Sequence, residues 1–369
     1  MASYDKTDLI PIFMPLKKTP KLNIKLLKEL SEATGAPGFE HNIRAIVRRE
    51  IKDHVDSITV DNMGNLIAVK KGTAKKPKKL MAAAHMDEIG FMVQHIDDNG
   101  FIRFCPLGGF DPKTLSSQRV TIHGKKDVVG VMGGKAAHLM SAEERKVNPQ
   151  LKDYFIDTGL PKKELEKLVA VGDSITRKRD FIQMGPCVNG KSLDNRMLVF
   201  VLIEVLKRLK KVPYDFYAVF TVQEEVGIRG AKVAVHEIQP DFGICLDVTI
   251  ANDTPGAAPH EYINKLGEGT SIDMMNGTVI ADRRLVSYLT GLAAKKKIAH
   301  QHDVMDAGGT DGWAMQMMTE KGCITGGISV PLRNMHQEVE MCHEVDINAT
   351  MDLLQLAVEN IDKGDWKQS

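Results

Sequence analysis

The chain has 369 residues, which is long enough for one large domain or two modest ones. Hydrophobic residues make up 43% and charged residues 26%, the ordinary balance of a globular protein. A net charge of +1 argues neither for a nucleic-acid-binding surface nor for an acidic tail. No apolar stretch reaches the about 18 residues that a transmembrane helix needs. We therefore expect neither a nucleic-acid partner nor a membrane partner.

The N-terminus and the cysteines both indicate a cytoplasmic protein. The first residues lack the basic start and apolar core of a signal peptide. The five cysteines form no CxxC pair and are odd in number, which fits reduced thiols better than a disulfide framework. We therefore expect the protein to reside in the cytoplasm.

The N-terminal part of the chain predicts two helices, a hairpin and a buried strand. Residues 1–21 contain three prolines and little periodicity, so we interpret them as an N-terminal extension. Apolar residues recur at helical spacing in 23–40 and 40–55, and alternation around a turn-rich centre predicts a hairpin at 57–72. The nearly continuous apolar run at 79–93 is typical of a central strand covered on both faces.

The pattern changes between residues 90 and 178. Short alternating runs punctuated by glycines dominate this segment, with a helix predicted at 161–170. This change predicts a small β-rich, barrel-like domain at 90–178. It would be inserted into a larger α/β domain made of residues 1–89 and 179–369.

Helices and strands alternate again after the insertion. The apolar patterns predict helices at 197–211, 230–238, 283–297, 311–318 and 348–361, and strands at 214–222, 241–248 and 323–330. This alternation predicts an α/β fold in which a mixed central sheet has helices on both faces.

Ionisable side chains gather where the predicted strands end. In α/β sheets, functional sites form at the carboxyl ends of the strands. The side chains found just past an apolar run, or just before a helix, are His85, Asp194, Glu224, Glu225, Asp247 and His336. We expect the sheet to bring these six side chains together.

The residue types indicate a metal site, because imidazole and carboxylate groups without thiolates suit zinc, cobalt or manganese. Two histidines and three carboxylates exceed what one catalytic zinc requires, and they suit two ions that share a bridging carboxylate. The motif His-x-Asp also places Asp87 on the same side of the strand as His85. There its carboxylate can hydrogen-bond the ring nitrogen that faces away from the metal.

Each of these residues also has an ordinary explanation when taken alone. Asp194 is suited to cap the helix that follows it, and Asp247 to cap a turn. The adjacent Glu224 and Glu225 could both face water in a surface turn. The joint occurrence of all the candidates at strand ends is what favours the metal site over these alternatives.

Six segments of the chain occur in a characteristic order, AAHMDEIGFMV, NGKSLDNR, TVQEEVGIRGA, CLDVT, GGTDG and RNMH. Together they resemble the TET-type, or glutamyl (deblocking), aminopeptidases, a family of dinuclear metallo-aminopeptidases. The resemblance extends from about residue 22 to 365, and the insertion is similar to that family's dimerisation domain. It implies a zinc-peptidase-like catalytic domain that carries an inserted dimerisation domain.

The resemblance implies a set of ligands for two divalent metal ions per subunit. One ion would be bound by His85, Asp194 and Asp247, and the other by Asp194, Glu225 and His336, with Asp194 bridging the two. Zinc is the first choice for both ions, with cobalt and manganese as alternatives.

The resemblance also implies a catalytic mechanism and an assembly. Glu224 would be the general base that takes a proton from the water between the metal ions and passes it to the leaving amine, while Asp87 would orient His85. The substrates would be short peptides, and the protein would be a homo-oligomer of dimers, up to a tetrahedral dodecamer. Departures from the family pattern at RNMHQEVE and at Gly312 in GGTDGW leave the preferred N-terminal residue open.

Two other functions are weighed against this one. A glycoside hydrolase also uses paired carboxylates, but two tryptophans and 5% aromatic residues leave little to stack against sugars, and the histidines would have no role. A non-catalytic assembly protein of the same fold would not need the complete ligand set. Hydrolysis of a β-glucan that a chelator does not inhibit would favour the glycoside hydrolase. Absence of metal from the purified protein would favour the non-catalytic assembly protein.

Overall fold

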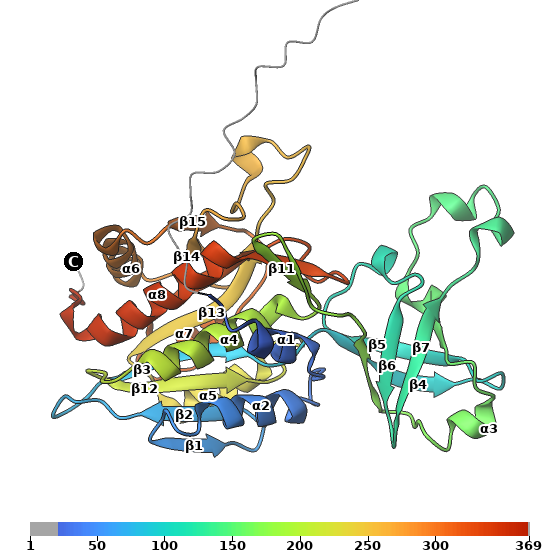
Figure 1. Cartoon of the computed structure of the whole chain (residues 1–369), viewed down its shortest axis with the longest axis horizontal. Coiled ribbons are helices and arrows are strands. Elements are labelled where there is room, and N and C mark those ends of the chain that lie inside the picture. The colour runs from blue at the N-terminus through green and yellow to red at the C-terminus, as the bar shows by residue number, and fades with distance from the viewer. Residues whose placement is uncertain (1–20, 368–369) are drawn as a thin grey trace, which may run out of the picture.

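An eight-stranded mixed sheet forms the centre of the computed structural model, which describes residues 21–367 (Figure 1). In spatial order its strands are β1 (Ser57–Val60), β2 (Leu66–Lys70), β12 (Asp215–Thr221), β3 (Lys79–His85), β13 (Phe242–Ile250), β16 (Ile324–Leu332), β14 (Thr270–Met275) and β15 (His300–Val304). Strands β12, β3, β13 and β16 run parallel. The middle of the sheet therefore has the parallel arrangement in which neighbouring strands end at one edge.

Helices cover both faces of this sheet. One face carries α1 (Ile24–Glu32), α2 (His41–Ile51), α4 (Leu193–Arg208), α6 (Arg283–Lys296) and α8 (Glu344–Asn360), and the other carries α5 (Arg229–Ile238) and α7 (Gly312–Met317). Side chains of β3 alternate between these layers, since Ala82 and Ala84 pack in the first and Met81 and Ala83 in the second. Burial on both faces explains the continuous apolar runs of the middle strands.

A closed barrel of six strands lies beside the sheet, at the right of Figure 1. Around the barrel the strands are β4 (Gly90–Ile96), β5 (Ile102–Leu107), β8 (Phe155–Asp157), β7 (Asp127–Gly133), β6 (Arg119–His123) and β9 (Ser174–Arg177). Its interior is a separate apolar core that includes Phe91, Ile122 and Ile156. The predicted fold class, a mixed α/β sheet with an inserted β-rich barrel, is confirmed. The residue limits given for the two domains stay a prediction.

A small three-stranded sheet joins two segments that are far apart in the sequence. It consists of β10 (Ile182–Met184), β11 (Cys187–Gly190) and β17 (Glu340–His343), paired antiparallel. Gly190 pairs with Glu340, so the chain that enters α4 lies beside the chain that enters α8. The sequence patterns did not predict this sheet, because its strands are three or four residues long and depend on the pairing of distant segments.

The apolar run at 79–93 is two strands rather than the one that was predicted. β3 ends at His85, residues 86–89 form a link, and β4 begins at Gly90 inside the barrel. The link is buried although it is not a strand. Continuous burial therefore hid the break, since an apolar run reports burial and does not report extended structure by itself.

The helix predicted at 161–170 is also shorter than expected. It is α3 (Lys162–Leu165), after which the chain forms turns that bring Val169 into the same barrel core as Leu165. Residues 1–20 of the predicted extension lie outside the described residues. Within residues 21–367 no helix is long and apolar enough to cross a membrane.

Candidate metal centre

Three neighbouring strands deliver most of the candidate residues to one edge of the sheet. β3 ends at His85, β12 ends at Thr221 just before Glu224 and Glu225, and β13 carries Asp247. Thr221 pairs with His85 in parallel register, so these two strand ends lie side by side. This is the edge at which parallel sheets bind their ligands.

Asp194 and His336 reach the same place from other elements. Asp194 lies in the first turn of α4, where its backbone is not helical (φ −77°, ψ 108°) and its peptide bond to Asn195 is cis. His336 lies in the loop between β16 and β17 with a left-handed backbone, φ 58°. All six predicted residues thus line one cavity of about 320 Å³.

Asp194 lies between the two histidines. Its Oδ1 is 3.2 Å from Nε2 of His85, and its Oδ2 is 3.1 Å from Nε2 of His336. Nε2 of His85 is also 3.8 Å from Oδ1 of Asp247, and Nε2 of His336 is 3.4 Å from Oε2 of Glu225. Two groups of three ligand atoms therefore share Asp194, with one of its oxygens in each group.

These spacings fit side chains that share a metal ion. Two ligands bound tetrahedrally to zinc at about 2.0–2.1 Å stand about 3.3 Å apart. One potential ligand atom each from His85, Asp194 and Glu225 lies within 4.8 Å of the others. Oδ1 of Asp194 and Oε1 of Glu225 are buried without a well-aligned hydrogen-bond partner among the described residues. Because buried charges are normally paired or bound to a metal, the donor set fits a metal ion.

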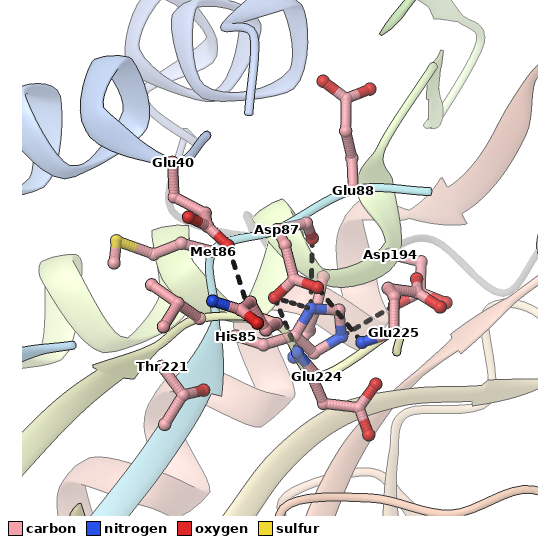
Figure 2. Close-up of polar contacts among 12 residues, drawn as sticks. Glu40, His85, Met86, Asp87, Glu88, Asp194, Thr221, Glu224 and Glu225 are labelled. Carbon is pink, nitrogen blue, oxygen red and sulfur yellow. Dashed lines mark hydrogen bonds and ion pairs between the residues drawn. The ribbon is translucent and has the colours of Figure 1, made fainter. Parts of the chain in front are cut away.

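Asp87 contacts both the histidine and the glutamate pair. Its Oδ1 lies 3.5 Å and its backbone oxygen 3.1 Å from Nδ1 of His85, on the side of the ring away from Asp194 (Figure 2). Its carboxylate also accepts hydrogen bonds from the backbone N–H groups of Glu224, at 3.0 Å, and Glu225, at 3.1 Å. The prediction that Asp87 shares a strand face with His85 is wrong, because β3 ends at His85 and a loop brings Asp87 back onto the ring.

Two hydrogen bonds fix the backbone around Asp194. Its N–H donates to Oε2 of the buried Glu340 at 3.0 Å, and Nδ2 of Asn195 donates to the carbonyl oxygen of Leu246 at 2.8 Å. Glu340 belongs to the small sheet. Sequence reasoning missed this residue, because a carboxylate at that position has no local signal until β17 pairs with β11.

The site concentrates negative charge in a buried space. Burial raises the pKa of Glu224 and of Asp247 well above the ordinary carboxyl value. Burial, and then the charge of Asp194, raise the pKa of Glu225. Burial alone would lower the pKa of His336, but its hydrogen bonds with Asp194 and Glu225 raise it to about 11. Added positive charge would stabilise this arrangement, and divalent ions are the usual source of such charge.

The two adjacent glutamates face different partners. Glu225 faces His336, whereas the carboxylate of Glu224 forms none of the ion pairs found within residues 21–367. Both side chains line the cavity. The geometry is therefore compatible with two separate tasks for the pair, and it contradicts the alternative that both simply face water in a surface turn.

The inserted barrel packs directly against the site, a contact that the sequence did not reveal. A Cβ atom placed on Gly109 would lie 3.5 Å from Nδ1 of His336. One placed on Gly108 would lie 3.4 Å from Cβ of Glu225. Both glycines follow β5, so a barrel loop forms one wall of the candidate metal centre.

Comparison with known proteins decides the family. Residues 64–353 match the family described as M42 glutamyl aminopeptidase. The chain belongs to this family. A putative aminopeptidase of Acetivibrio thermocellus is 41% identical over 334 residues, which are 90% of this chain and 97% of the relative. The lysyl aminopeptidase of Pyrococcus furiosus is 33% identical over 93% of this chain and 98% of its own length.

Solved structures agree with the M42 assignment. The TET1 peptidase of Pyrococcus horikoshii, which can assemble into a tetrahedron or a large octahedral shell, matches with a TM-score of 0.81 and 34% identity, over 91% of this chain and 98% of that chain. A structure named as an endoglucanase, from Thermotoga maritima, matches with a TM-score of 0.75 and 30% identity. The match covers 90% of this chain and 96% of that chain. Because the family and the curated relatives are peptidases, the glycoside hydrolase alternative is not supported. This M42 protein is a metal-dependent aminopeptidase.

Proposed function

We propose that this aminopeptidase uses two divalent metal ions to remove the N-terminal residue of short peptides. The observation that carries the proposal is the position of Asp194, whose two oxygens face His85 and His336 separately. Asp247 would complete the first metal site and Glu225 the second. Zinc is the first choice, and cobalt and manganese suit the same ligands.

Glu224 is the proposed general base. Metal ions in these positions would lower the pKa of a water molecule and polarise the scissile carbonyl group. Glu224 lines the same cavity, so its carboxylate can take a proton from the attacking water and pass it to the leaving amine. Asp87 would orient His85 and hold the backbone of the glutamate pair.

The proposed assembly is a homo-oligomer of dimers, up to a tetrahedral dodecamer, with the barrel as the dimerisation domain. The TET1 peptidase of the same fold can assemble into a tetrahedron or a large octahedral shell. The barrel exposes large apolar side chains, since Val129, Val131, Leu139 and Val147 are 46, 43, 73 and 69% exposed. Exposed apolar surface favours contact with another chain.

The proposed location is the cytoplasm. All five cysteines are free thiols. Reduced thiols are the usual state in a reducing compartment, and this agrees with the proposed location.

Substituting two carboxylates tests the division of tasks. Glu224→Gln should keep the metal content of the wild type and lower turnover by about 10²–10⁴-fold, because it removes only the proton carrier. Asp194→Ala should lose both metal ions, because each ion depends on one of its oxygens. Elemental analysis of purified protein gives the metal content, and aminoacyl reporter substrates assayed with zinc, cobalt and manganese give the turnover.

Glu237→Gln, at an exposed position of α5, is the matched control and should change neither quantity. Equal loss of metal in Glu224→Gln and Asp194→Ala would contradict the proposed roles. A wild-type protein that holds no metal and hydrolyses no substrate would favour the non-catalytic alternative.

A further inference from the structure

The wall of the cavity has two chemically different parts. One part is the six ionisable residues of the metal centre. The remaining side chains of its wall are mostly apolar and come from Ile228, Val248, Met305 and Met335, with Thr310 as the one neutral polar side chain. Ile228 and Met305 border the adjacent glycines Gly309 and Gly308, and this part of the wall is called the apolar end. Val248 and Met335 pack with the core on the α4 and α8 face of the sheet.

A glycine segment leaves room between the apolar side chains. Gly308 and Gly309 lie between β15 and α7 and line the cavity. A Cβ atom on Gly309 would lie 3.1 Å from Cγ2 of Thr278 and 3.7 Å from Cδ1 of Ile228, and one on Gly308, whose φ is +75°, would lie 3.3 Å from Cε of Met305. Side chains at these positions would occupy the space that Ile228 and Met305 border. Gly309 therefore leaves space beside Ile228 at the apolar end, whereas Gly308 is also required by its left-handed backbone.

The apolar end provides no partner for a charged side chain. Among the described residues that line the cavity, the ionisable ones are the five candidate ligands and Glu224, and there is no lysine or arginine. A glutamate side chain of a substrate would have no cation to pair with. A lysine side chain would find only carboxylates already assigned to the metal ions or to proton transfer. Burying either charge without a partner is costly.

We propose that this apolar pocket binds the side chain of the substrate's N-terminal residue and selects a neutral apolar residue such as leucine or methionine. The inference rests on the proposed function, because it assumes that the peptide's first carbonyl group lies at the metal centre. Burial of an apolar side chain beside Ile228 and Met305 stabilises the bound substrate in proportion to the area buried. Met305 is unbranched and flexible, so it can adapt to both branched and linear side chains.

The proposed preference for an apolar N-terminal residue differs from the preferences for glutamate and lysine that appear in the name of the M42 family and in the name of one relative. The M42 description names a glutamyl aminopeptidase, and the relative from Pyrococcus furiosus is a lysyl aminopeptidase. Members that share the fold can differ in the residues that line the pocket, and those residues decide specificity. In this chain they are the apolar side chains described above.

A panel of reporter substrates tests the proposal on the full-length, metal-loaded enzyme. The panel contains leucyl, methionyl, alanyl, glutamyl and lysyl p-nitroanilides. We expect kcat/KM for leucine and methionine to exceed that for alanine by at least about tenfold, because of the larger apolar area buried. We expect it to exceed that for glutamate and lysine by about 100-fold or more, because of the unpaired charge. Calorimetric titration with free L-leucine and free L-lysine should show tighter binding of leucine.

One variant and one matched control assign the effect to the pocket. Met305→Lys places a cation at the apolar end, so it should raise the ratio of glutamyl to leucyl kcat/KM by about tenfold. Met317→Lys makes the same change on α7 at a side chain that is 63% exposed and does not line the cavity, and it should leave the ratio unchanged. Circular dichroism confirms that both variants are folded.

The outcomes separate this inference from the proposed function. Hydrolysis of the panel with glutamyl or lysyl substrates preferred would overturn the apolar pocket and leave the metallo-aminopeptidase intact. Equal changes of the ratio in Met305→Lys and Met317→Lys would also overturn it. No hydrolysis of any substrate with zinc, cobalt or manganese would instead reject the proposed function itself.

Discussion

At the scale of single residues, Asp87 contacts two separate parts of the site. Its carboxylate lies beside Nδ1 of His85 and accepts the backbone N–H groups of Glu224 and Glu225. One side chain thereby sets the orientation of a proposed ligand and the position of the proposed base. Neighbours of this kind tune metal ligands through the hydrogen bonds they accept.

Asp87→Asn should lower metal affinity or turnover by about 10–100-fold. The amide can accept from only one of the two N–H groups, and it brings an NH₂ group against the other. Chelator competition measures the affinity, and a reporter substrate measures kcat. Asp98→Asn, in an exposed barrel turn whose aspartate side chain is 97% accessible, is the control and should behave as the wild type. Wild-type affinity and kcat in Asp87→Asn would show that Asp87 positions neither group.

At the scale of elements, the loop after β5 links the barrel to the metal centre. Gly109 lies against the ring of His336 from the barrel side, while β16 leads into that histidine from the sheet. Arg177, at the end of β9, donates a hydrogen bond to the carbonyl oxygen of Gln337, the residue that follows His336. The loop that carries His336 is thus held by two barrel segments.

Gly109→Ala and Gly109→Val should have different effects on the metal ion bound by His336. A Cβ atom at 3.5 Å from Nδ1 is an ordinary contact, so alanine should be tolerated. The methyl groups of valine extend about 1.5 Å beyond Cβ and would press against the ring. We expect the valine variant to lose at least about tenfold in affinity for one of two metal ions, as measured by calorimetric titration. Equal affinities in both variants would show that the barrel loop does not position His336.

The elements themselves could largely be predicted from the sequence, whereas some of their limits could not. Helical spacing of apolar residues predicted α4, α5, α6, α7 and α8, and apolar runs predicted the four parallel strands of the sheet. The break between His85 and Gly90 was missed, because burial continues through the link. The small sheet was missed because pairing between Gly190 and Glu340 depends on residues 150 positions apart in the chain.

At the scale of the whole molecule, the barrel lies beside the sheet, contacts it at the metal centre and has its own apolar core. The segment between β7 and β8 projects from it and carries Leu139 and Val147, which are 73 and 69% exposed (Figure 1). Such side chains are rarely left in water without a partner when they are numerous. The proposed dimerisation role of the barrel is therefore tested at these two positions.

The double variant Leu139→Asp, Val147→Asp should reduce the mass of the assembly, because charge on a buried contact is costly. Size-exclusion chromatography with light scattering measures the mass. Val233→Asp alters a 41% exposed valine on α5 of the sheet domain and serves as the control. An unchanged mass in the double variant would contradict a dimer contact at this segment, and a reduced mass in the control alone would place the contact on the sheet domain.

The sequence by itself determined the class of fold and the chemical identity of the candidate site. Residue type and position relative to an apolar run are local properties, so His85, Asp194, Glu225, Asp247 and His336 could be selected before any strand order was known. Local patterning also separated the β-rich insertion from the α/β domain that surrounds it.

Only the tertiary structure decided which groups touch. Strand β3 lies between β12 and β13, although β12 and β13 come more than a hundred residues later in the chain. The tertiary structure also sets the contacts of Asp194 with His85 and His336, the contact of Gly109 with His336 and the apolar end of the cavity. These features depend on packing between distant segments, and such packing leaves no mark on the local periodicity of a sequence.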